Sequence, residues 1–162
     1  MDLRSKCVGC VGALVVAAAC GGCGREAPPE APAVTINGRT WQVELALTVE
    51  QRYRGLSDRE QLDANAGMLF VYPTPQILDF CMRQCVIPLD VAFIGADQRV
   101  VKTCTMPVEP YGLERAVYSS DTPVQYALEV RAGALAEAGV KRGDRVDFSP
   151  GVPAAAKADP GP

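Results

Sequence analysis

The chain has 162 residues, 16 of them basic and 19 acidic, which is enough for one domain with a core of modest size. It has no cluster of lysine and arginine of the kind that neutralises phosphates, so we do not expect nucleic acid as a partner. It also lacks histidine, which excludes Ser-His-Asp and Cys-His catalysis and leaves carboxylates, cysteine, lysine, tyrosine or a bound cofactor for any enzymatic activity.

The N-terminal segment has the features of an export signal. Arg4 and Lys6 come before residues 8–19, which carry no charge and end in three alanines. A basic start, an apolar stretch of this length and small residues before a cleavage point predict a secretory signal peptide in residues 1–19. An uncleaved membrane anchor is the less favoured alternative, because glycines interrupt the stretch and a spanning helix needs about 20 strongly apolar residues.

A cysteine follows these small residues directly, as in a bacterial lipobox. There the thiol of Cys20 receives diacylglycerol, although Ala17 stands where a lipobox usually has leucine, and Cys23 is a second candidate acceptor. Residues 20–33 are rich in proline and poor in apolar side chains, which predicts an extended tether. We therefore expect an exported lipoprotein, held at the membrane by its N-terminal lipid and facing the periplasm or the cell exterior, with soluble secretion as an alternative.

Residues 34–148 carry the patterns of a single β-rich domain. Apolar and polar side chains alternate over residues 41–47, which predicts a half-buried strand. Thr48 with Gln51 three residues later forms a capping box, and Gly55 is a suitable end, so we expect a short helix between them.

The middle of this domain is expected to hold a buried strand and a hairpin. Residues 67–72 are an apolar run that ends at Pro73, which predicts a buried strand. Residues 87–94 and 99–106 flank a turn with the sequence Gly-Ala-Asp-Gln and predict a β-hairpin. Residues 107–123 contain three prolines and are expected to be the longest loop.

The C-terminal third is also predicted to consist mainly of short strands. Alternation over residues 126–130 predicts another strand, residues 134–138 can make a helical turn, and residues 145–148 form a last short strand. Residues 149–162 are predicted to be a disordered tail. Strands outnumber helices and their connections are short, so we expect a mainly β, mainly antiparallel domain.

Five groups of residues resemble, in order and spacing, the domain-of-unknown-function family 192, many of whose members are exported or lipid-anchored. The resemblance runs from about Val43 to Phe148 and implies a compact antiparallel β fold, barrel-like or sandwich-like, with one or two short helices at its edge. It implies no established reaction. The groups are Arg52-Tyr53-Arg54-Gly55-Leu56, Gly67 to Tyr72, Phe80-x-Met82-x-x-x-x-Ile87-Pro88-Leu89-Asp90, Leu128-Glu129-x-x-x-Gly133 and Gly143-Asp144-x-Val146-x-Phe148.

The chain departs from the pattern of this family at a few positions. Cys81 replaces the usual tryptophan between Phe80 and Met82, and residues 83–85 read Arg-Gln-Cys where the family has Lys-Asn-Thr. Ser57 stands where a methionine usually follows Gly-Leu. We expect these positions to lie in segments that line any pocket shared with the family.

Three cysteines, Cys81, Cys85 and Cys104, lie within the predicted domain. In an oxidising compartment they could form a structural disulfide, but residues four apart on a strand are about 13 Å apart, so a Cys81–Cys85 bond requires a turn between them. Buried free thiols are an alternative. A redox pair, with Arg83 lowering a thiol pKa, is a third.

A candidate pocket combines charged side chains from several motifs. Arg52 and Arg59 cluster around the predicted short helix, Arg83 lies between the cysteines, and Met82 is a core residue that could wall a cavity. Asp90 opens an apolar strand and could be an acid or a ligand-binding group, or else pair with an arginine or a backbone N–H. Glu129 is expected to be solvated or ion-paired.

These observations favour a non-catalytic envelope protein that binds a small ligand or a partner protein near Arg52, Arg59, Arg83 and Asp90. No nucleophile–base pair, metal site or cofactor motif is evident in the sequence. An envelope enzyme that uses Asp90 and Arg83, or a thiol-redox protein that uses Cys81 and Cys85, is one alternative. A structural accessory of another envelope protein is a further one.

Overall fold

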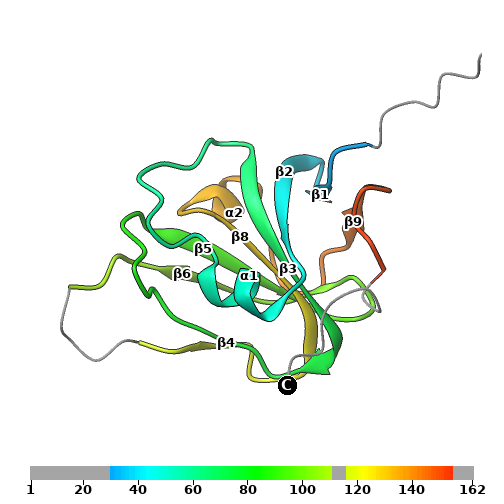
Figure 1. The fold of residues 1–162 in the computed structure, drawn as a ribbon. Coiled ribbons are helices and arrows are strands. Elements are labelled where there is room, and N and C mark those ends of the chain that lie inside the picture. Colours follow the sequence, from blue (N-terminus) through cyan, green and yellow to red (C-terminus); the bar gives the residue numbers. More distant parts are fainter. Residues whose placement is uncertain (1–29, 111–115, 155–162) are drawn as a thin grey trace, which may run out of the picture.

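The computed structural model describes residues 30–110 and 116–154, and this part of the chain folds into a curled sheet with two short helices (Figure 1). The sheet order is β6-β5-β8-β3-β2-β1-β9, and β4 and β7 form a separate two-stranded ladder. The strands are β1 (Ala33–Ile36), β2 (Arg39–Ala46), β3 (Ala66–Gln76), β4 (Asp79–Phe80), β5 (Leu89–Ile94), β6 (Val100–Met106), β7 (Tyr118–Ser119), β8 (Val124–Arg131) and β9 (Val146–Phe148). The helices are α1 (Val49–Arg54) and α2 (Ala134–Glu137), so the predicted mainly β fold with one or two short helices is confirmed.

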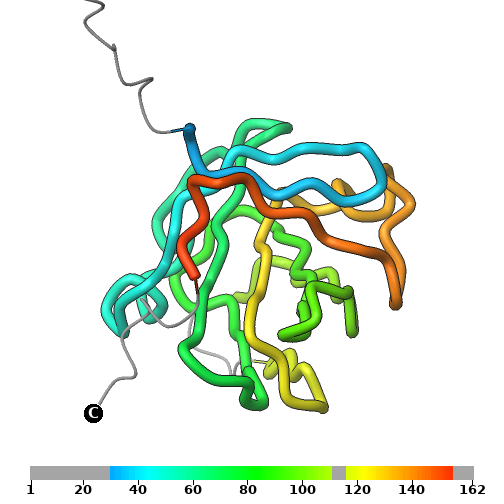
Figure 2. Tube along the Cα trace, turned by 90° about the vertical axis from the view of Figure 1, so that its right-hand side faces the viewer, coloured from blue at the N-terminus to red at the C-terminus, as the bar shows by residue number. Residues whose placement is uncertain are grey.

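The sheet curls until its two edges meet at one corner. β1 pairs with β9, so the first and last strands lie side by side (Figure 2). Arg99, before edge strand β6, forms a β-bridge with Arg145, before edge strand β9. The backbone N–H of Val100 also donates to the carbonyl of Asp144 at 2.9 Å. These contacts make the sheet a half-barrel, in agreement with the barrel-like expectation.

Alternation along the strands divides the apolar side chains between two cores. On β8, Leu128 and Val130 point to a core that includes Leu135 of α2, and we call this side of the sheet the α2 face. Ala127 of the same strand points the other way, into a core that includes Leu56 at the end of the α1 segment. We call that side the α1 face. Both faces of the central strands are therefore covered.

One ladder differs from the antiparallel expectation. β2 and β3 pair in parallel, from Gln42 beside Ala66 to Ala46 beside Phe70, whereas the other ladders of the described residues are antiparallel. Parallel neighbours need a crossover connection. The α1 segment provides it, because it returns the chain to the same end of the sheet.

The third strand continues past the proline that was expected to end it. β3 extends to Gln76, and its pairing with β8 jumps from Val71–Tyr126 to Gln76–Val124. Pro73 lies inside this bulge, where no ladder hydrogen bond is required of its missing N–H. Proline therefore bends the strand here instead of terminating it.

The ends of the domain join each other through β1, a strand that the sequence patterns did not predict. Ala33 donates its N–H to Ser149 Oγ at 2.9 Å, and its carbonyl accepts the Ser149 N–H at 3.0 Å. The described beginning of the predicted tail is therefore hydrogen-bonded into the fold. The predicted signal peptide, Cys20 and Cys23 lie outside the described residues. No helix in the described part is long and apolar enough to cross a membrane.

Candidate functional site

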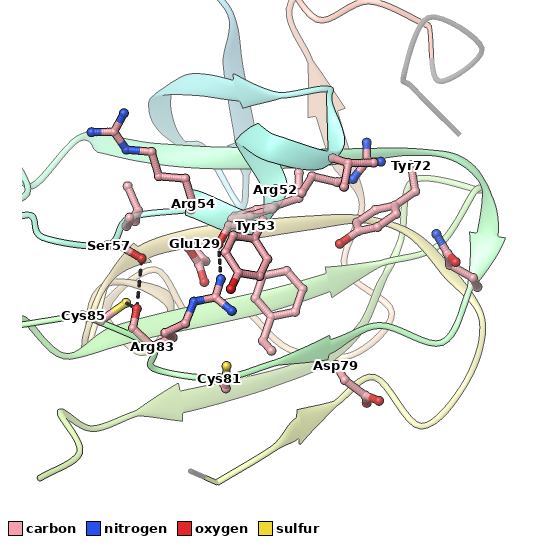
Figure 3. Close-up of a pocket in the computed structure, with 16 residues that line it drawn as sticks. Arg52, Tyr53, Arg54, Ser57, Tyr72, Asp79, Cys81, Arg83, Cys85 and Glu129 are labelled. Atoms are coloured by element: carbon pink, nitrogen blue, oxygen red, sulfur yellow. Dashed lines mark hydrogen bonds between the residues drawn. The ribbon is translucent and has the colours of Figure 1, made fainter. Parts of the chain in front are cut away.

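A cavity of about 440 Å³ opens on the α1 face, between α1, the segment from Phe80 to Cys85, and the central strand β8 (Figure 3). Its wall carries four aromatic side chains, and arginines lie around it. Two carboxyl groups line it, Glu129 of the seven-stranded sheet and Asp79 of β4. The lining residues are Val49, Arg52, Tyr53, Arg54, Gly55, Leu56, Ser57, Phe70, Tyr72, Gln76, Asp79, Phe80, Cys81, Arg83, Cys85 and Glu129.

Helix α1 fixes one side of the cavity. Its predicted capping box is present: Thr48 Oγ1 accepts the Gln51 N–H at 3.2 Å, and Gln51 Oε1 accepts the Thr48 N–H at 2.9 Å. Arg52 is held against the sheet, because it donates to the carbonyls of Leu47 at 2.6 Å and Val71 at 3.1 Å. Its guanidinium also lies 4.7 Å from the centre of the Tyr72 ring, so one wall is an arginine stacked on an aromatic side chain.

The opposite side comes from the segment around Arg83. The Arg83 guanidinium lies 3.5 Å from the centre of the Tyr53 ring and donates to the Tyr53 carbonyl. Ser57 Oγ donates to the carbonyl of Arg83 at 2.9 Å. A turn closed by the Cys85 N–H and the Met82 carbonyl, at 3.3 Å, presents Arg83 in this position. Side chain and backbone together therefore attach this segment to α1 across the mouth of the cavity.

The floor of the cavity is Glu129, which is only 6 % exposed. It lies in the middle of β8, beside Met68 of β3 and Val91 of β5. Within residues 30–110 and 116–154, no hydrogen-bond donor or ion-pair partner of its carboxyl is found. Burial therefore raises the pKa of Glu129 from 4.5 to about 8, and the carboxyl holds its proton at neutral pH.

This position corrects the expectation that Glu129 is solvated or ion-paired. The alternation of β8 correctly placed Glu129 opposite Leu128 and Val130. However, β8 is a central strand with both faces covered, so the opposite side is a second core and not solvent. The sequence signal that could have indicated a buried Glu129 is a single acidic residue in an otherwise apolar run.

The cysteines of the described residues, Cys81, Cys85 and Cys104, are free thiols. Cys81 and Cys85 line the cavity, whereas Cys104 lies on the edge strand β6. Burial, assisted by Glu129 and Cys81, raises the pKa of Cys85 to about 11 and outweighs the opposite effect of Arg83. The thiolate needed for redox chemistry is therefore scarce at Cys85.

The structure separates the five residues of the predicted pocket. Arg52 and Arg83 line the cavity, and Met82 is buried in the adjacent core at 3 % exposure. Arg59 lies outside the lining and pairs with Glu44 at 2.5 Å. Asp90 also lies elsewhere.

Asp90 is on the α2 face, where its carboxylate is fully engaged. It is 2 % exposed, accepts the hydroxyl of Thr105 at 2.7 Å and accepts the N–H of Leu135 at 3.2 Å. None of its hydrogen-bond partners in the described chain is an arginine. Asp90 thus attaches α2 to the sheet and takes no part in the cavity.

The positions where the sequence departs from the family pattern meet at this cavity. Ser57, Cys81, Arg83 and Cys85 all line it, although they come from two separate segments. No cluster of three or more acidic or cysteine side chains that could hold a metal ion occurs among the described residues. What the cavity offers is therefore aromatic surface, three arginines, the carboxyl of Asp79 and the protonated carboxyl of Glu129.

Two solved structures are similar to this chain. A protein of unknown function from Novosphingobium aromaticivorans is 34 % identical, with a TM-score of 0.65, over 71 % of this chain and 83 % of that one. A protein from Sinorhizobium meliloti, described as a "putative transcription regulator", is 33 % identical, with a TM-score of 0.64, over 73 % of this chain and 94 % of that one.

No curated protein matches the chain. The model of one family matches residues 32–148, which cover the whole half-barrel from β1 to β9. The chain therefore belongs to the domain-of-unknown-function family 192 (DUF192, described as "Uncharacterized ACR, COG1430").

Proposed function

We propose that this protein is an exported, lipid-anchored binding protein whose cavity on the α1 face holds a small organic anion. The observation that carries the proposal is the floor of the cavity. Glu129 is 6 % exposed, has no hydrogen-bond donor in the described chain and opens into the cavity, so its carboxyl is available to a ligand there. A polar group placed among aromatic side chains in a concave site is typical of ligand sites.

The charge of the cavity favours an anion. The protein as a whole has a formal charge of −3. The cavity, by contrast, is lined by three arginines and by two acidic residues, of which Glu129 is protonated at neutral pH. Arg52 and Arg83 keep their positive charge although their N–H groups bond backbone carbonyls. A local positive field in an acidic protein attracts small anions.

The aromatic walls favour an organic ligand over an inorganic ion. Phe70, Phe80, Tyr53 and Tyr72 supply flat apolar surface. Phe70 and Phe80 pack edge to face with ring centres 4.9 Å apart, so this wall is preformed. A cavity of about 440 Å³ suits a molecule with one or two rings.

The pocket is tested with three probes that share one ring but differ in charge: benzoate, benzylammonium and benzyl alcohol. Saturation-transfer NMR on the full lipoprotein in detergent is expected to show benzoate binding best, and Arg83→Ala is expected to weaken it several-fold. The matched control is Arg59→Ala, because Arg59 lies outside the cavity and pairs with Glu44. A preference for benzylammonium, or equal losses in both variants, contradicts the proposal.

Export and lipid attachment are supported by the order of basic start, apolar stretch, small residues and cysteine at the N-terminus. Labelling cells with radioactive palmitate is expected to mark the wild type and Cys23→Ser, and not Cys20→Ser. Labelling lost only in Cys23→Ser would move the acceptor to Cys23. An unlabelled wild type in the soluble fraction rules out the anchor.

A further inference from the structure

We propose that Glu129 is the hydrogen-bond donor for the ligand, so that the cavity selects organic anions with a neutral acceptor oxygen at the end opposite their charge. This inference rests on the proposed function and adds a ligand class to it. The anionic end would lie near the arginines at the mouth, the ring between the aromatic walls, and the acceptor at the floor.

The surroundings of Glu129 keep its carboxyl neutral and in place. Its neighbours across β8 are Met68 and Val91, and both strands that flank β8 are themselves inside the sheet. These side chains cannot donate a hydrogen bond, so neither of the two neighbours stabilises the ionised form. The O–H group therefore has its acceptor only in the cavity.

Two other titratable groups near the carboxyl have raised pKa values. Tyr72 comes from β3, and burial raises the pKa of its hydroxyl above the ordinary value of 10.0. The pKa of Cys85, in the segment below, is raised to about 11. Arg52 and Arg54 of α1 and Arg83 supply the guanidinium groups of the lining. The remaining lining groups that can ionise are Tyr53, Asp79 and Cys81.

Binding should then follow the protonation of Glu129. Below about pH 8 the carboxyl donates to the acceptor of the ligand. Above that pH the carboxylate has no proton to donate, and its lone pairs face those of the acceptor, so affinity is expected to fall by about tenfold per pH unit. An analogue without the acceptor leaves the buried carboxyl unpaired and should bind about tenfold more weakly at pH 7.

The test uses two probes of nearly equal shape, 4-acetylbenzoate and 4-isopropylbenzoate. Only the first has a carbonyl acceptor opposite its carboxylate. For the wild-type lipoprotein, NMR titration at pH 7 is expected to favour 4-acetylbenzoate about tenfold, and this preference should disappear by pH 9. The reference is Glu129→Gln, whose amide N–H₂ donates at every pH. The preference of this variant for 4-acetylbenzoate should therefore persist from pH 6 to pH 9.

A second variant, Glu129→Leu, removes the donor and keeps the bulk. It is expected to bind both probes equally, with the fold of each variant checked by its amide NMR spectrum. Equal affinities in the wild type, an unchanged preference in Glu129→Leu, or a pH profile shared by the wild type and Glu129→Gln overturns the inference while leaving the pocket as a binding site. Failure of the wild type to bind either probe overturns the proposed function itself.

Discussion

The two faces of the sheet each bury one carboxyl, and they treat it in opposite ways. On the α2 face, Asp90 accepts from Thr105 and from the N–H of Leu135, and it is not among the residues that line the cavity. On the α1 face, Glu129 has no partner among the described residues and opens into a cavity of about 440 Å³. The two residues lie on the neighbouring strands β5 and β8, at almost the same level.

This difference separates a residue that holds the fold together from one that is available to a ligand. A buried carboxylate with two donors is stabilised where it is, and removing it leaves those donors unpaired. A buried carboxyl without donors is a cost to the fold. Among the described residues, the second kind lies on the face that also has arginines and aromatic walls, and this coincidence is the basis of the proposed site.

The pH dependence of stability should show the contrast most strongly. The folded protein keeps the Glu129 proton up to about pH 8, whereas the unfolded chain releases it near 4.5. The folded state therefore binds more protons in this window, and the free energy of unfolding falls as pH rises through it. The slope is at most about 1.4 kcal/mol per pH unit, or roughly 5 kcal/mol over the whole window.

Urea unfolding of the wild type and Glu129→Gln between pH 4.5 and pH 9 measures this effect. The variant is expected to be flatter, and above pH 8 it should be more stable than the wild type. Glu137, whose pKa is lowered by Arg131, contributes a loss of stability at acid pH, but both proteins share it. Parallel curves would show that Glu129 is not the buried acid described above.

Removing the carboxylate of Asp90 should lower the free energy of unfolding by somewhat less than the pH change described for Glu129. Asp90→Ala leaves the Thr105 hydroxyl and the Leu135 N–H without their buried acceptor, and a loss of about 3 kcal/mol is expected. The matched control is Asp147→Ala, because its pair with Arg145 is exposed and worth less than about 1 kcal/mol. Thermal unfolding at pH 7 compares the two, and similar small losses would place Asp90 outside the set of fold-stabilising residues.

Substitutions that change packing should also differ between the two faces in their effect on stability, but by less. A Cβ added at Gly67 would lie 2.6 Å from the carbonyl oxygen of Glu129 and 3.1 Å from Val130, so Gly67→Ala must displace β8. The expected loss is about 2 kcal/mol. Ser57→Ala, on the cavity wall, removes one hydrogen bond and should lose about 1 kcal/mol or less. Chemical denaturation measures both, and a neutral Gly67→Ala would mean that the strands can move apart.

Local signals in the sequence located most of the secondary structure. The capping box of Thr48 and Gln51 identified α1, and the turn at residues 95–98 identified the β5–β6 hairpin. The bulge that lets β3 pass Pro73, and the short strand β1, depend on partners far along the chain and gave no local pattern.

The candidate site was predictable only in part. Arg52 and Arg83 were identified from their motifs, and the departures at Ser57, Cys81 and Cys85 pointed to the segments that line the cavity. Asp90 was assigned to the pocket because a carboxylate beside an apolar run looks the same in sequence on either face. Glu129 was assigned to the surface because alternation shows that two faces exist, but not what covers each one.

The sequence by itself determined most of the elements and the family, because hydrophobic alternation, capping and turn chemistry act over a few residues. Only the tertiary structure decided which carboxyl finds donors. Strand order brings Thr105 and α2 to Asp90 and brings apolar side chains to Glu129. That difference arises from contacts between residues distant in the chain, and it decides that one acid stabilises the fold while the other faces the cavity.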